Sequence, residues 1–219
     1  MSTAVRAVVF DCDGVLVDSE KAWFVGIVEV FQRRGIQELV TGPASSLYGA
    51  SVGDVVSVLE RELGEPLDTE AVTKEVFDAI LAAIADGVVA MDGAVELLET
   101  IRGSRPLAVA SNGSRETVEA SLKAASIPFV FDAIVAVEPP LRPKPAPDVY
   151  LHACELLGVD PTDAIAVEDS LPGAKAARAA GMTVVGLGSA DGLNKTADQV
   201  VANLGDQGLR DLLGLGPLL

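Results

Sequence analysis

Short runs of apolar residues alternate along the chain with longer segments of helical period. The first run, AVRAVVF at residues 4–10, stops abruptly at a polar loop, and similar runs follow at residues 106–110, 133–137, 164–167 and 183–187. Short Val- and Ala-rich runs bounded by polar residues are typical of buried parallel strands. Because helical segments separate these runs, the pattern predicts a doubly wound α/β protein with a parallel sheet.

Several of the segments between the runs carry recognisable helix ends. Ser114 and Ser170 each precede an Ala-rich helical stretch, and a serine hydroxyl at that position accepts hydrogen bonds from the unpaired N–H groups of the first turn. Pro147-Asp148 begins a further helix, and Gly158 ends it. Glycine suits a helix C-terminus because it adopts the left-handed conformation. These signals place helices at residues 115–125, 148–157 and 171–180.

A long segment lies between the first two predicted strands. Residues 19–87 exceed the length of one crossover helix and show several helical patterns with no clear strand. Apolar residues recur there at the spacing that gives a helix one apolar face. We therefore expect residues 19–87 to form an inserted α-helical domain, and residues 1–18 together with 88–219 to form the core.

The composition narrows the class of protein. The chain has 219 residues, 49% of them hydrophobic, and a formal net charge of -16, so it is long enough to bury a sizeable core. Nucleic-acid binding needs clustered Lys and Arg, which this acidic balance opposes. No apolar run approaches the roughly 20 residues of a membrane-spanning helix. We expect a soluble, cytoplasmic protein without a signal peptide, with no nucleic-acid or membrane partner, as a monomer or weak homodimer.

The two cysteines do not form a metal-binding or redox pair in the sequence. Cys12 and Cys154 lie far apart and show no CxxC spacing, so reduced thiols are expected. Cys12 lies between two acidic residues, whose negative charge raises the pKa of a neighbouring thiol. We expect Cys12 to pack in the interior. The apolar tail LLGLGPLL is expected to dock on the core, with a partner contact as the alternative.

Four polar clusters follow four of the predicted strands. They are Asp11-Cys12-Asp13-Gly14, Ser111-Asn112-Gly113, Lys144 in RPKPAPD, and Glu168-Asp169-Ser170. Singly, each has a structural explanation as a turn, a helix cap or a surface charge. A calcium-binding loop is excluded for the first cluster because Val15 stands where that loop needs an oxygen ligand. Since ligands bind at the carboxyl ends of strands in open α/β sheets, the four clusters together predict one site.

The four motifs resemble those of the haloacid dehalogenase superfamily of aspartate-nucleophile phosphohydrolases. They read FDCDGVLVDSE, ASNGS, RPKPAPD and VEDSLPGAKAARAAG, and they span the core on both sides of the insert. The position and helical character of the insert resemble the small cap of the branch that includes β-phosphoglucomutase and phosphosugar phosphatases. The resemblance implies a Rossmann-like core and a Mg²⁺-dependent reaction on a phosphate ester.

The resemblance also implies a role for each core residue. Asp11 would be the nucleophile and Asp13 the general acid and base. The phosphate would be bound by Ser111, Asn112 and Lys144. Mg²⁺ would be held by Asp11, Asp169 and the backbone carbonyl of Asp13, with Glu168 just outside the ligand set. A cation is needed because a carboxylate cannot approach a phosphate dianion unaided, and Asp13 also distinguishes this chain from the dehalogenases, whose halide leaving group needs no proton.

The insert offers further candidates for substrate recognition. They are Lys21, Trp23, Tyr48 and Lys74. Trp23 stands where the mutase pattern has a His, and the segment around Tyr48 lacks the basic residue that related enzymes have before a Gly, so both departures count against a mutase. Lys74 resembles a cap lysine that contacts substrate in relatives, and Lys21 is a second cation. A core role for Trp23 and a solvated position for Lys74 remain open.

Three functions are compatible with these observations. The favoured one is a phosphatase that hydrolyses a small phosphorylated metabolite, a sugar or sugar-acid monophosphate, through an aspartyl-phosphate intermediate. A phosphosugar mutase would instead need a bisphosphate activator. A non-catalytic regulator that only binds a phosphometabolite would be expected to lack the nucleophile or the acid, whereas this chain has both Asp11 and Asp13.

Overall fold

The chain divides into two compact units. The computed structural model describes residues 5–36 and 52–216. One unit comprises Met1–Asp18 and Val89–Leu219, and the other comprises Ser19–Val88. The sequence placed the second junction after residue 87, one residue earlier. Each unit is described separately below.

The larger unit contains a parallel sheet of six strands, which confirms the predicted fold class. Its strands are β1 (Ala7–Phe10), β4 (Leu107–Ala110), β5 (Ala133–Val135), β6 (Ala164–Glu168), β7 (Thr183–Leu187) and β8 (Gln199–Val201). Their order in the sheet is β5-β4-β1-β6-β7-β8, and every neighbouring pair is parallel. The chain thus winds outward in both directions from β1, and the loops after β1, β4 and β6 meet at one edge of the sheet.

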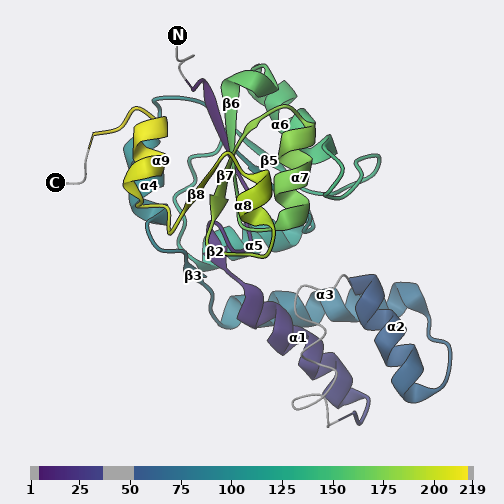
Figure 1. The fold of residues 1–219 in the computed structure, drawn as a ribbon. Coiled ribbons are helices and arrows are strands. Elements are labelled where there is room, and N and C mark those ends of the chain that lie inside the picture. The colour runs from purple at the N-terminus through teal and green to yellow at the C-terminus, as the bar shows by residue number, and fades with distance from the viewer. Residues whose placement is uncertain (1–4, 37–51, 217–219) are drawn as a thin grey trace. The chain divides into compact units, whose positions relative to one another are not determined.

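Helices cover both faces of this sheet. They are α4 (Ala94–Ile101), α5 (Arg115–Ala124), α6 (Asp148–Leu157), α7 (Leu171–Ala179), α8 (Leu193–Thr196) and α9 (Gln207–Leu212), with a 3₁₀ turn η3 at Pro161–Asp163. Figure 1 shows α6 and α7 on one side of the strands and α4 and α9 on the other. All four residues of β1 are therefore buried, which explains the continuous apolar run in place of an alternating one.

The predicted helix ends are observed. The Ser114 hydroxyl accepts from the N–H of Thr117 at the start of α5, and the Ser170 hydroxyl accepts from the N–H of Gly173 at the start of α7. Gly158 ends α6 with a φ of 65°. No helix within the described ranges has the length and apolar character needed to cross a membrane.

The sequence pattern did not reveal three short strands. β8 has three residues, while β2 (Val17–Asp18) and β3 (Val89–Ala90) have two each and form a separate antiparallel pair. The N–H of Met91 also donates to the carbonyl of Leu16, extending the contact between these two segments. Segments this short contain too few residues for any hydrophobic period to be recognised.

The smaller unit is helical in its described part, as predicted. It contains α1 (Glu20–Arg33), α2 (Val52–Leu63) and α3 (Thr69–Asp86). α1 packs along α3, and the approach is close because a Cβ on Gly26 would lie 2.7 Å from the backbone of Ile80. Ile27, Val30, Val76 and Ile80 are buried in this unit, and Arg34 pairs with Glu75. The helices thus have their own apolar core.

Candidate active site

Three of the four predicted clusters come together around the Lys144 side chain. Asp11 directly follows β1, Glu168 ends β6, and Lys144 lies four residues before α6. The Lys144 ammonium donates to Asp11 Oδ1 at 2.5 Å and to Glu168 Oε1 at 2.6 Å. Carboxylate oxygens of Asp11, Glu168 and Asp169 all lie within 4.8 Å of one another. The structure therefore brings a cation and three acids together at the carboxyl edge of the sheet.

The second cluster contributes by fixing the Lys144 backbone. The N–H of Lys144 donates to Asn112 Oδ1 at 2.8 Å, and Asn112 Nδ2 donates to the Lys144 carbonyl at 3.4 Å. One side chain after β4 thereby satisfies both backbone groups of Lys144. The predicted phosphate-binding residue Asn112 thus has a structural partner, and its contact with phosphate stays a prediction.

Ser111 begins this second cluster directly after β4. It is buried, and its N–H donates to the carbonyl of Val135. Its hydroxyl oxygen accepts from the N–H of Gly113 at 2.9 Å. A hydroxyl that accepts one hydrogen bond still has its own proton to donate. Ser111 can therefore donate to a bound anion while the turn that follows it stays fixed.

Glu168 is fully buried, and both of its carboxylate oxygens accept hydrogen bonds. Besides Lys144, its Oε1 accepts from the Tyr150 hydroxyl at 2.7 Å. Its Oε2 accepts from the N–H of Ser170 at 3.2 Å and from the Ser170 hydroxyl at 3.0 Å. A Cβ added to Gly173 would lie only 1.7 Å from Oε1. The Glu168 carboxylate therefore occupies a place that requires glycine in the first turn of α7.

The loop after β1 turns tightly beside this cluster. Gly14 has a φ of +80°, and a Cβ there would lie 2.0 Å from Asp169 Oδ2, so glycine is required by both conformation and space. Asp13 is half-buried and pairs with Val17 in an isolated bridge.

Cys12 is buried with a free thiol. Burial raises the pKa of the Cys12 thiol well above its ordinary value, and the Asp13 and Asp11 charges add to this.

The two acids beside Cys12 were predicted to raise the pKa of its thiol, and both contribute to the rise. The larger cause is burial, which the sequence expectation did not include. Both cysteines are buried free thiols, as expected for a chain without a disulfide or a CxxC pair. A thiol with a raised pKa is a poor nucleophile at neutral pH, so Cys12 contributes packing.

The acids of the cluster are strongly affected by burial and by one another. Burial raises the pKa of Asp11 well above its usual range; the Lys144 charge opposes this rise, and Glu168 and Asp169 add to it. Burial, followed by the Glu168 charge, raises the pKa of Asp169 to about 7. Burial would lower the pKa of Lys144, but the charges of Asp11 and Glu168 outweigh it and raise this pKa. The ammonium is firmly protonated.

The donor set is suited to a hard divalent cation. The cluster consists of three carboxylates, and Lys144 is the single cationic side chain in the described ranges that forms an ion pair with any of them. With all three acids ionised, negative charge would exceed positive charge in a buried place; together with burial, this repulsion raises the pKa of Asp11 and Asp169, and a further cation would offset it. Oxygen ligands match Mg²⁺. Because Glu168 already accepts four hydrogen bonds, Asp11 and Asp169 are the better-placed ligands.

The predicted residues of the helical unit are less constrained. Lys21 and Lys74 are exposed, and Lys74 pairs with Asp78 at 2.6 Å. Trp23 is half-buried and packs edge to face against Phe77, with ring centroids 6.5 Å apart. Tyr48 lies outside the described residues. Substrate contact by these four residues stays a prediction.

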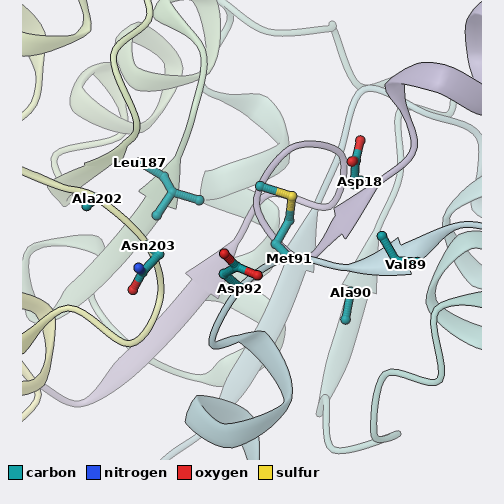
Figure 2. Close-up of a pocket in the computed structure, with 8 residues that line it drawn as sticks. All are labelled: Asp18, Val89, Ala90, Met91, Asp92, Leu187, Ala202 and Asn203. Carbon is teal, nitrogen blue, oxygen red and sulfur yellow. The ribbon is translucent and has the colours of Figure 1, made fainter.

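A separate hollow lies in the core unit between the β2–β3 pair and the carboxyl ends of β7 and β8. Its volume is about 250 Å³, and its lining includes Asp18, Met91, Asp92, Leu187 and Asn203. Figure 2 shows the Met91 thioether between the carboxylates of Asp18 and Asp92. Of the predicted site residues that the structure describes, none lines this hollow, so it is distinct from the Lys144 cluster.

Tyr150 was not among the predicted site residues. In the sequence it is only part of the helical pattern of α6, whereas in the structure it is buried against Glu168 and Lys144. The available signal was a tyrosine, an aromatic residue with a polar tip, in the first turn of the helix that follows Lys144. Buried tyrosines usually hydrogen-bond through that tip, but the sequence does not show which partner the tip reaches.

Comparison with known proteins agrees with this fold and site. Residues 5–181 match the family of haloacid dehalogenase-like hydrolases. Fructose-1-phosphate phosphatase YqaB of Escherichia coli (strain K12) is 32% identical over 181 residues, which cover 81% of this chain and 93% of that protein. The crystal structure of CbbY from Rhodobacter sphaeroides in complex with phosphate has a TM-score of 0.74 at 26% identity and covers 98% of this chain and 97% of that one.

A further relative is much longer than this chain. The chloroplastic protein Suppressor of Quenching 1 of Arabidopsis thaliana is 33% identical over 222 residues, which cover 96% of this chain and 20% of that protein. The chain therefore spans about one fifth of that relative. The open parallel sheet with an acidic cluster at its carboxyl edge is a Rossmann-like α/β fold. The extent of the family match assigns the chain plainly: it belongs to the haloacid dehalogenase-like hydrolases.

Proposed function

We propose that the protein is a Mg²⁺-dependent phosphatase that acts on a small phosphorylated metabolite, a sugar or sugar-acid monophosphate. The observation that carries this proposal is the buried contact of Lys144 with Asp11 and Glu168, beside Asp169. The family supports a hydrolase, and the similarity to a sugar-phosphate phosphatase supports the substrate class.

Asp11 is the nucleophile of the proposed reaction. Its carboxylate oxygen attacks phosphorus, the bond from phosphorus to the ester oxygen breaks, and an aspartyl-phosphate forms. Asp13 gives its proton to the departing alkoxide. In the second step Asp13 takes a proton from water, the water oxygen attacks phosphorus, and the bond to Asp11 breaks to release inorganic phosphate. Such acid and base assistance contributes about 10² to 10⁴ in rate.

Lys144 and Ser111 stabilise the charge on the transferring phosphoryl group. Among the described residues, Asp11 and Glu168 accept from the Lys144 ammonium, which leaves its third N–H for a phosphoryl oxygen. The Ser111 hydroxyl donates to a second oxygen. Fixed donors of this kind act without reorganisation during the reaction, and loss of one typically costs about 10² to 10³ in rate.

Asp11 and Asp169 would hold Mg²⁺, with the backbone carbonyl of Asp13 completing the protein ligands. When bound, the ion offsets the repulsion between the Asp11 carboxylate and the phosphate dianion. Glu168 stays outside the ligand set because Lys144, Tyr150 and Ser170 occupy both of its oxygens. The same residues serve any phosphate ester, so they do not select the leaving group.

Selection of the leaving group is assigned to the helical unit. Lys21, Trp23, Tyr48 and Lys74 are the candidates for contact with the part of the substrate beyond the phosphate. Cap elements commonly supply such contacts and exclude water from the reaction. The departures from the mutase pattern at Trp23 and near Tyr48 favour transfer of the phosphoryl group to water over its return to a sugar.

The proposal is tested by phosphate release from a panel of sugar and sugar-acid monophosphates, with and without Mg²⁺. We expect release to require Mg²⁺ and to fall by at least about 10³ in Asp11→Asn, because the nucleophile is lost. Asp211→Asn, at an exposed position on α9, is the matched control and should retain full activity.

Two outcomes would contradict this function. Equal rates for the wild type and Asp11→Asn would exclude the aspartyl-phosphate route. A requirement for a sugar bisphosphate, with the phosphate returned to the sugar, would identify a mutase. Mass spectrometry of the rapidly quenched reaction provides a direct check, since one added phosphoryl group should appear on the peptide that contains Asp11.

A further inference from the structure

Tyr150 contacts the candidate active site at two points. Its hydroxyl donates to Glu168 Oε1 at 2.7 Å, and its ring lies with the centroid 5.0 Å from the Lys144 ammonium. We propose that Tyr150 is a positioning residue that fixes Glu168 as the acceptor for Lys144 and thereby directs the ammonium to Asp11 and the transferring phosphoryl group. This inference rests on the proposed phosphatase function.

Lys144 and Tyr150 share one carboxylate oxygen of Glu168. Glu168 Oε1 accepts from both Lys144 and Tyr150, while Oε2 accepts from Ser170 alone. The Tyr150 hydroxyl takes up part of the negative charge on Oε1, so that oxygen attracts the ammonium less strongly. Without the hydroxyl, Lys144 would be held more tightly by Glu168 and less available to Asp11 and the phosphoryl oxygens.

The Glu168 carboxylate has little freedom to rotate. Its carboxylate lies in the group of acids suited to hold a cation, so a rotation would make it a competing metal ligand. Tyr150 restrains Oε1, Ser170 restrains Oε2, and the Gly173 backbone lies directly against the carboxylate. Partners that orient the groups around a metal site typically change metal affinity or activity by about 10- to 100-fold when they are lost.

The hydroxyl and the ring of Tyr150 make different contacts. A cation over an aromatic face is attracted by the ring electrons, and phenylalanine would provide that attraction and fill the same apolar space. A buried hydroxyl is unfavourable unless it is hydrogen-bonded, and its one donor is directed at Glu168. The hydroxyl therefore has a role distinct from packing, and Tyr150→Phe removes that role alone.

The test uses Tyr150→Phe, Tyr150→Leu and the control Ser121→Ala, which removes a buried hydroxyl from α5. We expect Tyr150→Phe to lower kcat about tenfold, as for a lost hydrogen bond to a charged group, with KM within about twofold of the wild-type value because the leaving-group contacts are elsewhere. Tyr150→Leu also loses the ring and should lower kcat further. Ser121→Ala should leave kcat unchanged.

A second readout does not depend on turnover. Orthovanadate adopts the five-coordinate geometry of phosphoryl transfer, and calorimetry in the presence of Mg²⁺ measures its affinity. We expect Tyr150→Phe to weaken this affinity about tenfold. If the wild type released no phosphate from any substrate, the phosphatase proposal would fail, and the vanadate measurement would still decide whether Tyr150 orders the anion site.

A double-mutant cycle with Glu168→Gln tests the route of the effect. If Tyr150 acts through Glu168, Tyr150→Phe should change kcat by less than about twofold in the Glu168→Gln background, since interacting residues are not additive. A full tenfold loss in that background would overturn the proposal, because it would show that Tyr150 acts independently of Glu168. Unchanged kcat and vanadate affinity in Tyr150→Phe alone would overturn it as well.

Discussion

The core unit and the helical unit hold their candidate residues in different ways. In the core, Asp11, Lys144 and Glu168 are buried, and the ammonium contacts both carboxylates. In the helical unit, Lys21 and Lys74 are exposed and Trp23 is half-buried. Charges buried in a low-dielectric interior must be paired, and their geometry is therefore fixed, whereas exposed charges keep rotamer freedom.

Under the proposed function, this difference would separate the reaction from the choice of substrate. A fixed buried cluster can treat every phosphoryl group alike, because that group has the same shape and charge in all phosphate esters. An exposed surface adapts to leaving groups of different shape, but each contact contributes little. Substitutions in the core should therefore change kcat strongly, and substitutions in the helical unit should change KM weakly.

The largest effect is expected for Lys144→Gln. The substitution removes the charge that faces both Asp11 and Glu168, so we expect a loss of about 10³ in kcat and a lower free energy of unfolding by about 3–5 kcal/mol. Phosphate release and thermal unfolding measure the two effects. The control Lys175→Gln, at an exposed position on α7, should change neither kcat nor the free energy of unfolding. Equal effects of the two substitutions would contradict the contrast between buried and exposed charges.

An intermediate effect is expected for Gly173→Ala. In an ordinary helical position alanine is more favourable than glycine by up to about 1 kcal/mol, but here the new Cβ would overlap the Glu168 carboxylate. We expect kcat to fall by about 10- to 100-fold and the unfolding temperature to decrease. The matched change Gly53→Ala, at an exposed position in α2, should raise the unfolding temperature. A rise in both variants would show that Glu168 is not confined by Gly173.

The smallest effect is expected for Lys74→Gln. Its ion pair with Asp78 is exposed, and such pairs contribute at most about 1 kcal/mol. If Lys74 contacts the substrate, KM should rise about threefold, within the range for an exposed charge contact, while kcat and the free energy of unfolding stay unchanged. The control Lys123→Gln, at an exposed position on α5, should leave KM unchanged, and steady-state kinetics measure both variants. A large fall in kcat would show that the helical unit also takes part in the reaction.

The sequence was sufficient for the fold class and for the order of the site motifs. Five of the strands and the helices that begin at Arg115, Asp148 and Leu171 follow from apolar runs and capping residues, because these are local signals. Asp11, Ser111 and Asp169 directly follow strand ends, and a parallel sheet necessarily brings such positions to one edge. Lys144 instead lies in the loop between β5 and α6, so its contact with the acids does not follow from this rule.

The contacts that hold the site residues in place could not be predicted from the sequence. Asn112 holds a backbone 32 residues away, and Tyr150 reaches an acid 18 residues away. No spacing in the sequence predicts either contact, because both contacts depend on how strands β4 and β6 and helix α6 pack. Asn112 was therefore interpreted only as a phosphate ligand, and Tyr150 was not singled out. The two-residue strands β2 and β3 were too short to be detected.

The two buried thiols can report when the packing of the core unit opens. Cys12 follows the first buried strand and Cys154 lies in α6, so both are inaccessible to a reagent in water while the sheet and its covering helix stay packed. Modification of either sulfur then requires a global or local opening of that packing. The rate of alkylation under native conditions therefore measures how often this packing opens, without the need to introduce a further cysteine.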